Sequence, residues 1–164
     1  ATVCLPNGPL CEACPWKEVC RAQKSGRWRE LPVKSKAKAR RIEDRTVLVI
    51  KAEDKVLLHK RANKGLLAGL YEFPNVEGHL KEEEVITYLK KMGLSPIRLK
   101  KLEDSRHIFS HIEWRMCAYR IAVSSLEEAP QGEFLFVDKR ESDKKYAIPS
   151  AFRAYTRYMK EENT

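Results

Sequence analysis

The sequence predicts an α+β fold in which two helices pack on a mixed β-sheet. One observation predicts this fold, and two more predict how the chain divides. From Thr46 onward, apolar runs of strand length alternate with two amphipathic helical segments. Four of the five cysteines lie within the first 20 residues, and a basic stretch separates them from the apolar runs. The 164 residues therefore divide into a cysteine-rich segment (1–20), a basic connector (21–45) and a globular domain (46–164).

The strands are predicted from short apolar or alternating runs at residues 46–50, 55–60, 70–73, 113–123 and 133–137. A turn at Glu53-Asp54 joins the first two strands, and Pro74 stops the third. Alternation along 113–123 places Cys117, Tyr119, Ile121 and Val123 on one side. Cys117 is therefore predicted to be a buried structural thiol.

Two helices are predicted from their apolar spacing. The first covers Glu82 to Met92, with acids in its first turn, lysines in its last turn and Gly93 as its stop. Its apolar face contains Val85, Ile86, Leu89 and Met92. The second begins at Pro149 and buries Ile148, Phe152, Tyr155 and Met159.

The charge is concentrated in the connector. The chain has 32 Lys and Arg against 23 Asp and Glu, and residues 21–45 alone hold ten basic residues against three acids. Such blocks bind polyanions, although a solvated linker is the alternative. No apolar run approaches the ~20 residues that cross a bilayer, and the first residues lack a secretory pattern. A cytoplasmic, nucleoid-associated protein without membrane contact is expected.

Cys4, Cys11, Cys14 and Cys20 form the pattern C-x6-C-x2-C-x5-C. A structural zinc site usually pairs two close-set cysteine pairs across a longer gap. The short, unequal gaps favour the four ligands of a cubane iron–sulfur cluster. Zinc and disulfide bonds remain the alternatives.

Two motifs resemble known families. The cysteine pattern, with Pro15 after the third cysteine, resembles the end of the catalytic domain in helix-hairpin-helix DNA glycosylases. That resemblance implies a 4Fe-4S cluster on the four cysteines, with no part in base excision. The segment KGLLAGLYEFP at 64–74 resembles the Gly-Leu-Trp-Glu-Phe-Pro region of Nudix-like (MutT-like) folds.

Nudix hydrolases gather metal with Arg-Glu-x-x-Glu-Glu-x-Gly, whose carboxylates hold a divalent ion beside a pyrophosphate. Registered on Gly93, two of those acids are Lys90 and Lys91 here, and the glycine pair after Pro74 is Asn75-Val76. A Nudix-like fold without hydrolase chemistry is predicted. A Nudix pyrophosphohydrolase acting on an oxidised nucleotide such as 8-oxo-dGTP is the alternative.

The segment HIFSHIEW at 107–114 resembles the Phe-Ser-His loop of the MutY adenine DNA glycosylases, and the three motifs occur in that family's order. The resemblance implies the C-terminal portion of such an enzyme: cluster loop, connector and a Nudix-like domain that recognises 8-oxoguanine opposite adenine. The implied partners are duplex DNA containing 8-oxoguanine:adenine and an upstream helix-hairpin-helix catalytic domain. The expected state is a monomer. The family's catalytic acids precede the cysteines, so this chain alone is expected to be an inactive fragment.

Within the loop, the resemblance gives lesion binding to Phe109, Ser110 and His111. In 8-oxoguanine, N7 becomes an N–H donor and C8 carries a new carbonyl. The Ser110 hydroxyl can accept from N7–H, while Phe109 and His111 support the loop. A core anchor is the alternative for Phe109, and a hydrogen-bonded strand residue is the alternative for His111. His59, His79 and His107 are expected to be structural.

The connector cations are expected to meet DNA phosphates, which position a protein without specifying sequence. They are Arg27, Arg29, Lys34, Lys36, Lys38, Arg40 and Arg41. Trp28 is expected to pack rather than to stack on a base. A cluster-bearing DNA-binding protein without lesion preference is a third interpretation, which leaves Phe109-Ser110-His111 unexplained.

Overall fold

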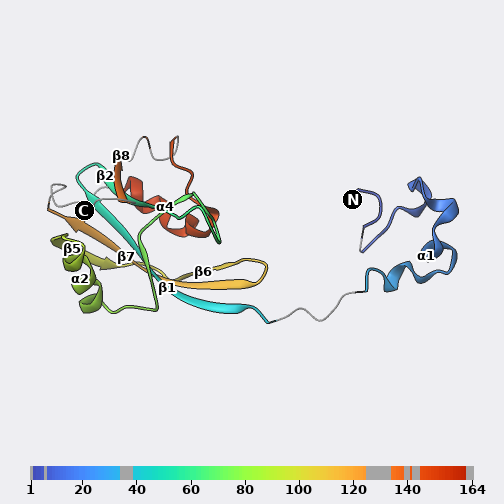
Figure 1. The fold of residues 1–164 in the computed structure, drawn as a ribbon, viewed down its shortest axis with the longest axis horizontal. Helices are drawn as coiled ribbons and strands as arrows, with labels where there is room; N and C mark the ends of the chain where they lie inside the picture. Colours follow the sequence, from blue (N-terminus) through green and yellow to red (C-terminus); the bar gives the residue numbers. More distant parts are fainter. Residues whose placement is uncertain are drawn as a thin grey trace. The chain divides into compact units, whose positions relative to one another are not determined.

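The computed structural model describes residues 2–5, 7–33, 39–124, 134–138, 141 and 145–161. The chain forms two compact units, Ala1–Ala39 and Arg40–Thr164 (Figure 1). In the described ranges, no helix is both long and apolar enough to span a membrane.

The first unit consists of short helical turns joined by loops. They are the 3₁₀ helices η1 (Cys11–Ala13), η2 (Lys17–Val19) and η3 (Arg27–Glu30), and the helix α1 (Arg21–Lys24). None of these turns contains a buried residue. A unit this small buries too little apolar surface to fold well by a core alone, so a bound cofactor or a packed neighbour has a large effect on it.

The second unit is built on one mixed sheet. Its strands are β1 (Arg41–Ala52), β2 (Lys55–Lys60), β3 (Tyr71–Glu72), β4 (Asn75–Glu77), β5 (Pro96–Lys101), β6 (Ser105–Ile108), β7 (Ile112–Val123) and β8 (Phe134–Asp138). The main order is β3-β2-β1-β7-β5, with β4 paired to β1, β6 to β7 and β8 to β2. Strands β1 and β7 run parallel from Arg41 opposite Ile112 to Lys51 opposite Ala122, and the other pairs are antiparallel.

The two central strands direct alternate side chains to opposite faces. On one face, Val47 and Val49 of β1 join Trp114 and Met116 of β7 beneath the C-terminal helices η4 (Ser150–Phe152) and α4 (Arg153–Lys160). On the other face, Leu48, Ile50, Cys117, Tyr119 and Ile121 pack against α2 (Glu82–Lys91). One sheet between two helices confirms the predicted α+β fold (Figure 1).

Both predicted helices and the turn at Glu53-Asp54 are present. Val85 and Leu89 of α2 are buried, as are Phe152, Tyr155 and Met159 at the C-terminal helices. Cys117 is buried and free, as predicted, and its Sγ lies 3.3 Å from the Thr46 hydroxyl.

The structure differs from the prediction at the sheet edges. Strands β4, β5 and β6 were not expected, because they are short or carry mostly exposed polar side chains. Strand β1 begins at Arg41, so residues 41–45 of the predicted connector lie in the sheet. Residue 133, the first of the predicted last strand, lies outside the described residues, and β8 ends at Asp138.

Candidate lesion-recognition site

The Phe109–His111 segment is the tight turn of the β6–β7 hairpin. The Phe109 N–H donates to the Ile112 carbonyl at 2.8 Å, which closes the turn. The Arg41 N–H donates to the His111 carbonyl at 3.0 Å, so the first residue of β1 also holds it. The hairpin and the beginning of β1 extend side by side from the domain (Figure 1).

Ser110 and His111 are exposed at the end of this hairpin. The Ser110 Oγ lies 3.0 Å from His111 Nδ1, so the two side chains share a hydrogen bond across the turn. Its direction follows the imidazole tautomer. An exposed hydroxyl with a second lone pair can accept a hydrogen bond from a base edge.

Phe109 anchors the turn to the core. Its ring is half-buried, packs on the α4-side core, and meets the Trp114 ring edge-on at 5.0 Å between centroids. The His107 ring, on strand β6 just before the turn, contacts the Phe109 ring at 4.7 Å between centroids. Phe109 is thus the core anchor left open by the sequence, and through it the tip is fixed to the sheet.

A partly buried polar network lies behind this anchor. Trp114 is fully buried, and its indole N–H donates to Glu43 Oε2 at 2.9 Å. Arg45 donates to the same carboxylate oxygen at 2.9 Å, and its guanidinium lies 4.4 Å over the Trp114 ring. Arg41 pairs with the other oxygen of Glu43. These bonds, that from Arg45 above all, lower the pKa of Glu43 from its ordinary value.

Sequence reasoning missed Glu43, Arg45 and Trp114. Their partnership depends on the parallel register that sets Glu43 opposite Trp114, 71 residues away. The one local signal is the R-x-E-x-R alternation at 41–45, which places three charges on one side of a strand.

A buried charge lies in the segment that resembles Nudix-like folds. The Glu72 carboxylate is 4% exposed and accepts from Arg61 at 2.7 Å, and His59 Nδ1 lies 3.2 Å from its other oxygen. Arg61 Nε also donates to the Leu66 carbonyl at 2.9 Å. The same guanidinium lies 5.9 Å from the Trp114 ring centroid, so this cluster adjoins the turn's anchor.

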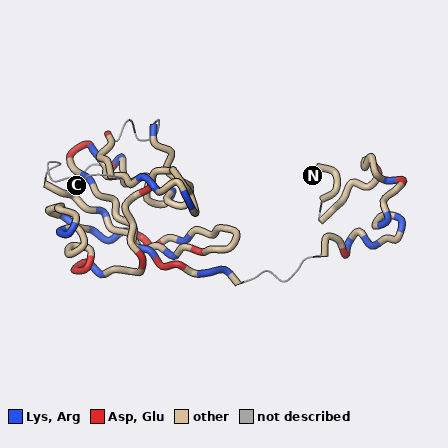
Figure 2. Tube along the Cα trace, in the orientation of Figure 1, with Lys and Arg blue, Asp and Glu red and all other residues tan. Residues whose placement is uncertain are grey.

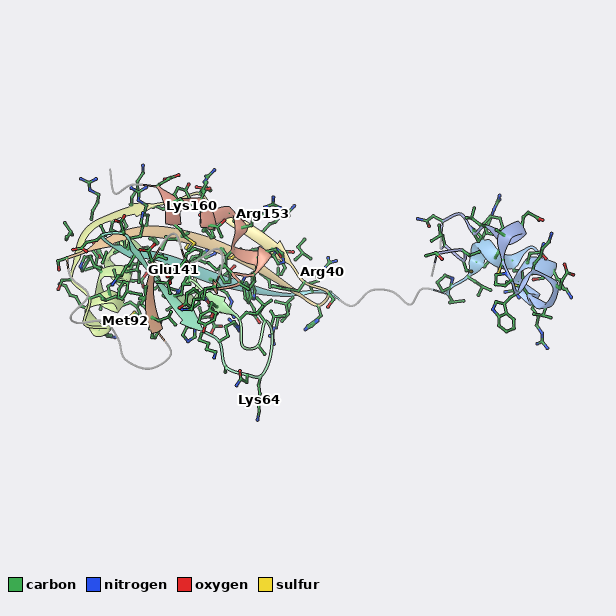
Figure 3. All side chains as sticks on the ribbon, turned by 90° about the horizontal axis from the view of Figure 1, so that it is seen from above. Arg40, Lys64, Met92, Glu141, Arg153 and Lys160 are labelled. Carbon is green, nitrogen blue, oxygen red and sulfur yellow. The ribbon has the colours of Figure 1, made fainter. Side chains whose placement is uncertain are left out.

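Arg61 thereby organises the loop between β2 and β3. Two backbone hydrogen bonds span this loop. The Arg61 N–H donates to the Leu70 carbonyl, and the Gly69 N–H donates to the Ala62 carbonyl. Leu67 is held at φ 57°, a left-handed conformation that a leucine adopts only under tertiary constraint. Lys64 points away from the domain at the end of the loop (Figure 3).

The α2 helix lacks the metal-binding acids of Nudix hydrolases. Lys90 and Lys91 occupy the positions of the paired carboxylates, and both are exposed. Glu82, Glu83 and Glu84 lie in the first turn, where the Glu84 carboxylate accepts from the Lys81 N–H at 2.8 Å. Their position at the helix N-terminus explains them without a metal.

The predicted phosphate-binding cations divide between the units (Figure 2). Arg27 pairs with Glu30 at 2.8 Å, and Arg29 lies 4.9 Å over the half-buried Trp28 ring. Arg40 is exposed at the beginning of the second unit, next to Arg41 and the turn. The others, Lys34, Lys36 and Lys38, lie outside the described residues.

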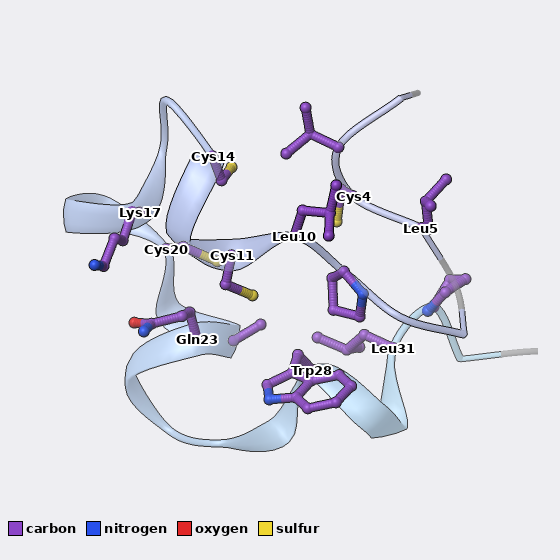
Figure 4. Close-up of a pocket in the computed structure, with 14 residues that line it drawn as sticks. Cys4, Leu5, Leu10, Cys11, Cys14, Lys17, Cys20, Gln23, Trp28 and Leu31 are labelled. Carbon is purple, nitrogen blue, oxygen red and sulfur yellow. The ribbon is translucent and has the colours of Figure 1, made fainter.

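The four N-terminal cysteines line one cavity of about 370 Å³ (Figure 4). Apolar side chains, Leu10, Trp28 and Leu31 among them, form the rest of its wall. All four thiols are free, and within the described ranges no three metal-binding side chains are grouped closely enough to hold an ion. Four thiols around one apolar cavity suit a sulfur-ligated cluster in donor type and number. Trp28 packs here, as the sequence predicted.

A mixed sheet between α2 and α4 defines the class of this protein. The NUDIX domain family matches residues 45–158, well over half of the chain, and the chain belongs to this family. The MutT protein from Methanosarcina mazei shares the fold, with a TM-score of 0.55 and 15% identity over 73% of this chain and 94% of that one.

Curated proteins similar to the chain include adenine DNA glycosylases. The chain is 31% identical over 112 residues to that of Buchnera aphidicola subsp. Schizaphis graminum, covering 68% of this chain and 31% of that protein. It is 30% identical over 179 residues to that of Mus musculus, covering 79% and 34%. The chain spans about a third of the length of these relatives.

A solved structure agrees with them. The C-terminal domain of mouse MUTYH, determined in complex with human PCNA, matches with a TM-score of 0.53 and 27% identity. The match covers 71% of this chain and 88% of that one. The predicted resemblance to the C-terminal portion of the adenine DNA glycosylases is confirmed.

Proposed function

We propose that this chain is the lesion-recognition part of a MutY-type adenine DNA glycosylase, and that it recognises 8-oxoguanine opposite adenine in duplex DNA. In the whole enzyme, adenine is released by hydrolysis of its N-glycosidic bond after base flipping. That chemistry belongs to the helix-hairpin-helix catalytic domain, and this chain supplies the selection of the site.

One observation supports the proposal most. A hydroxyl and an imidazole are exposed on a hairpin turn whose first residue, Phe109, is fixed to the core. A recognition group needs this combination, because a polar tip on a rigid support places its hydrogen bonds accurately. Lys90 and Lys91 count against the Nudix hydrolase alternative, because they occupy the two positions at which the paired carboxylates of that family gather metal.

The test is the binding of this chain to duplexes containing 8-oxoguanine:A, G:A and G:C at fixed salt. Ser110→Ala is expected to reduce the preference for the oxidised duplex by about 1–2 kcal/mol, the contribution of one hydrogen bond and the unsatisfied N7–H left behind. Ser124→Ala, an exposed serine just beyond the other end of β7, is the matched control and should keep the parent preference. Equal binding of the parent to all three duplexes would contradict the proposal.

The cysteine unit is proposed to hold a 4Fe-4S cluster through Cys4, Cys11, Cys14 and Cys20. Anaerobic reconstitution with iron and sulfide should load roughly four of each per chain. Cys14→Ser should lower that content, whereas Cys117→Ala should not, because Cys117 is buried in the sheet of the other unit. Iron and sulfide are measured chemically on the purified chain. Tight binding of a single zinc ion in their place would contradict the assignment.

A further inference from the structure

The exposed turn is too short to position itself. Only three residues connect β6 to β7, and two of them are exposed. The place of the Ser110 hydroxyl therefore depends on what holds the two ends of the turn. At one end, the Arg41 N–H binds the His111 carbonyl. At the other, the Phe109 ring rests edge-on against Trp114.

Trp114 is itself held at several points. Its ring lies 5.8 Å from the Phe152 ring of η4 and has the Arg45 guanidinium over its face. Its N–H is fully buried, and a buried indole donor needs an acceptor. Glu43 supplies that acceptor from β1, so the orientation of the indole plane is set by a strand that is distant in sequence.

The Glu43–Arg45 pair does more than fill the space beside Trp114. Arg45 donates both to Glu43 and to the Asn75 side chain, at 2.9 and 2.8 Å. Its Nε is buried and has no hydrogen-bond partner among the described residues, which is an unfavourable arrangement. An apolar side chain would fill this space without that penalty, but it would not fix the angle of the indole.

From these contacts we propose that Trp114, oriented by Glu43 and Arg45, is a positioning residue for lesion recognition. It acts through Phe109 and sets where the Ser110 hydroxyl meets the base edge. The inference rests on the proposed function, since it assigns Trp114 to the same turn. It also links the turn to β1, the strand that begins within the last residues of the predicted connector.

The test uses the 164-residue chain and the ratio of its affinities for 8-oxoguanine:A and G:A duplexes. Trp114→Phe keeps a ring against Phe109 but removes the N–H that Glu43 accepts. Glu43→Ala removes the acceptor and keeps the indole. Each is expected to lower the ratio about threefold, as for the loss of one net hydrogen bond. Trp114→Phe should leave the affinity for G:C DNA little changed, whereas Glu43→Ala releases Arg41 and should raise the affinity for all the duplexes alike. Glu43→Gln, whose amide oxygen can still accept from the indole, should keep most of the parent ratio.

Tyr119→Phe is the matched control. Tyr119 is a buried aromatic residue of the same strand on the opposite face, and its hydroxyl donates to the Leu80 carbonyl at 2.9 Å. This variant should be less stable than the parent but should keep the parent ratio of affinities for the 8-oxoguanine:A and G:A duplexes. If both Trp114→Phe and Glu43→Ala fold, by thermal unfolding, and keep the parent ratio, the inference is wrong. It is also wrong if Tyr119→Phe lowers the ratio equally. If the parent chain itself shows no preference for the 8-oxoguanine:A duplex, the proposed function is wrong, and the inference that rests on it is wrong too.

Discussion

Replacing Arg61 with alanine is expected to lower the free energy of unfolding of the globular domain by about 3–5 kcal/mol, the usual effect of leaving a buried charge without its partner. The Glu72 carboxylate is 4% exposed and receives its shortest hydrogen bond from Arg61. Removing the guanidinium leaves His59 as the remaining side-chain partner of that carboxylate among the residues that the structure describes. Chemical denaturation followed by circular dichroism measures the change.

The Arg61→Ala substitution should destabilise the loop between β2 and β3 more than it destabilises the sheet. Arg61 Nε holds the Leu66 carbonyl, and the neighbouring Leu67 is kept in a left-handed conformation. Without that bond the strained residue has less to hold it, so the loop is expected to open before the sheet unfolds. Faster hydrogen exchange at the Gly69 amide, which donates to Ala62, would report this opening.

Two further variants separate lost charge compensation from lost packing. The double substitution Arg61→Leu with Glu72→Leu removes both charges and should recover much of the stability, because apolar replacement of a buried ion pair is often tolerated. Lys60→Ala, next in sequence but exposed, should change the stability by less than about 0.5 kcal/mol. An Arg61→Ala domain as stable as the parent would contradict the assigned importance of the pair.

The periodicity of the sequence was sufficient for the two helices and the central strands. The continuous apolar run in β1, the alternation in β7 and the 3.6-residue spacing in α2 depend only on which faces each element buries. The apolar run predicts a first strand over residues 46–50, whereas β1 continues through Lys51 to Ala52. In the structure Lys51 is 2% exposed, and its ammonium donates to the Glu161 carbonyl beyond α4. A contact between residues so distant in sequence leaves no local pattern.

The candidate site was predicted only in part for the same reason. The turn residues form a contiguous motif, so Phe109, Ser110 and His111 could be named from the sequence. The groups that support them come from β1, β7 and the loop after β2, and they meet only through the parallel register of β1 and β7. Register is fixed by the whole sheet rather than by any one segment.

The affinity of the chain for DNA is expected to fall steeply with salt, and the connector lysines should account for most of the slope. Arg27 and Arg41 already pair with Glu30 and Glu43, which leaves five predicted phosphate contacts. They are Arg29, Lys34, Lys36, Lys38 and Arg40. Five contacts give a slope of about −4.5 in log affinity against log salt, so raising the salt fourfold should weaken binding by about 500-fold.

Changing Lys34, Lys36 and Lys38 together to alanine leaves two contacts, and the same rise in salt should then weaken binding only about tenfold. The ratio between 8-oxoguanine:A and G:A duplexes should not change, because phosphate contacts carry no information about the base. Fluorescence anisotropy over a salt series measures both quantities. A matched triple variant, with Lys81, Lys90 and Lys91 changed to alanine, removes the same charge from the α2 region and should keep the parent slope. If that control flattens the slope equally, the net charge of the chain, and not the connector, governs the encounter with DNA.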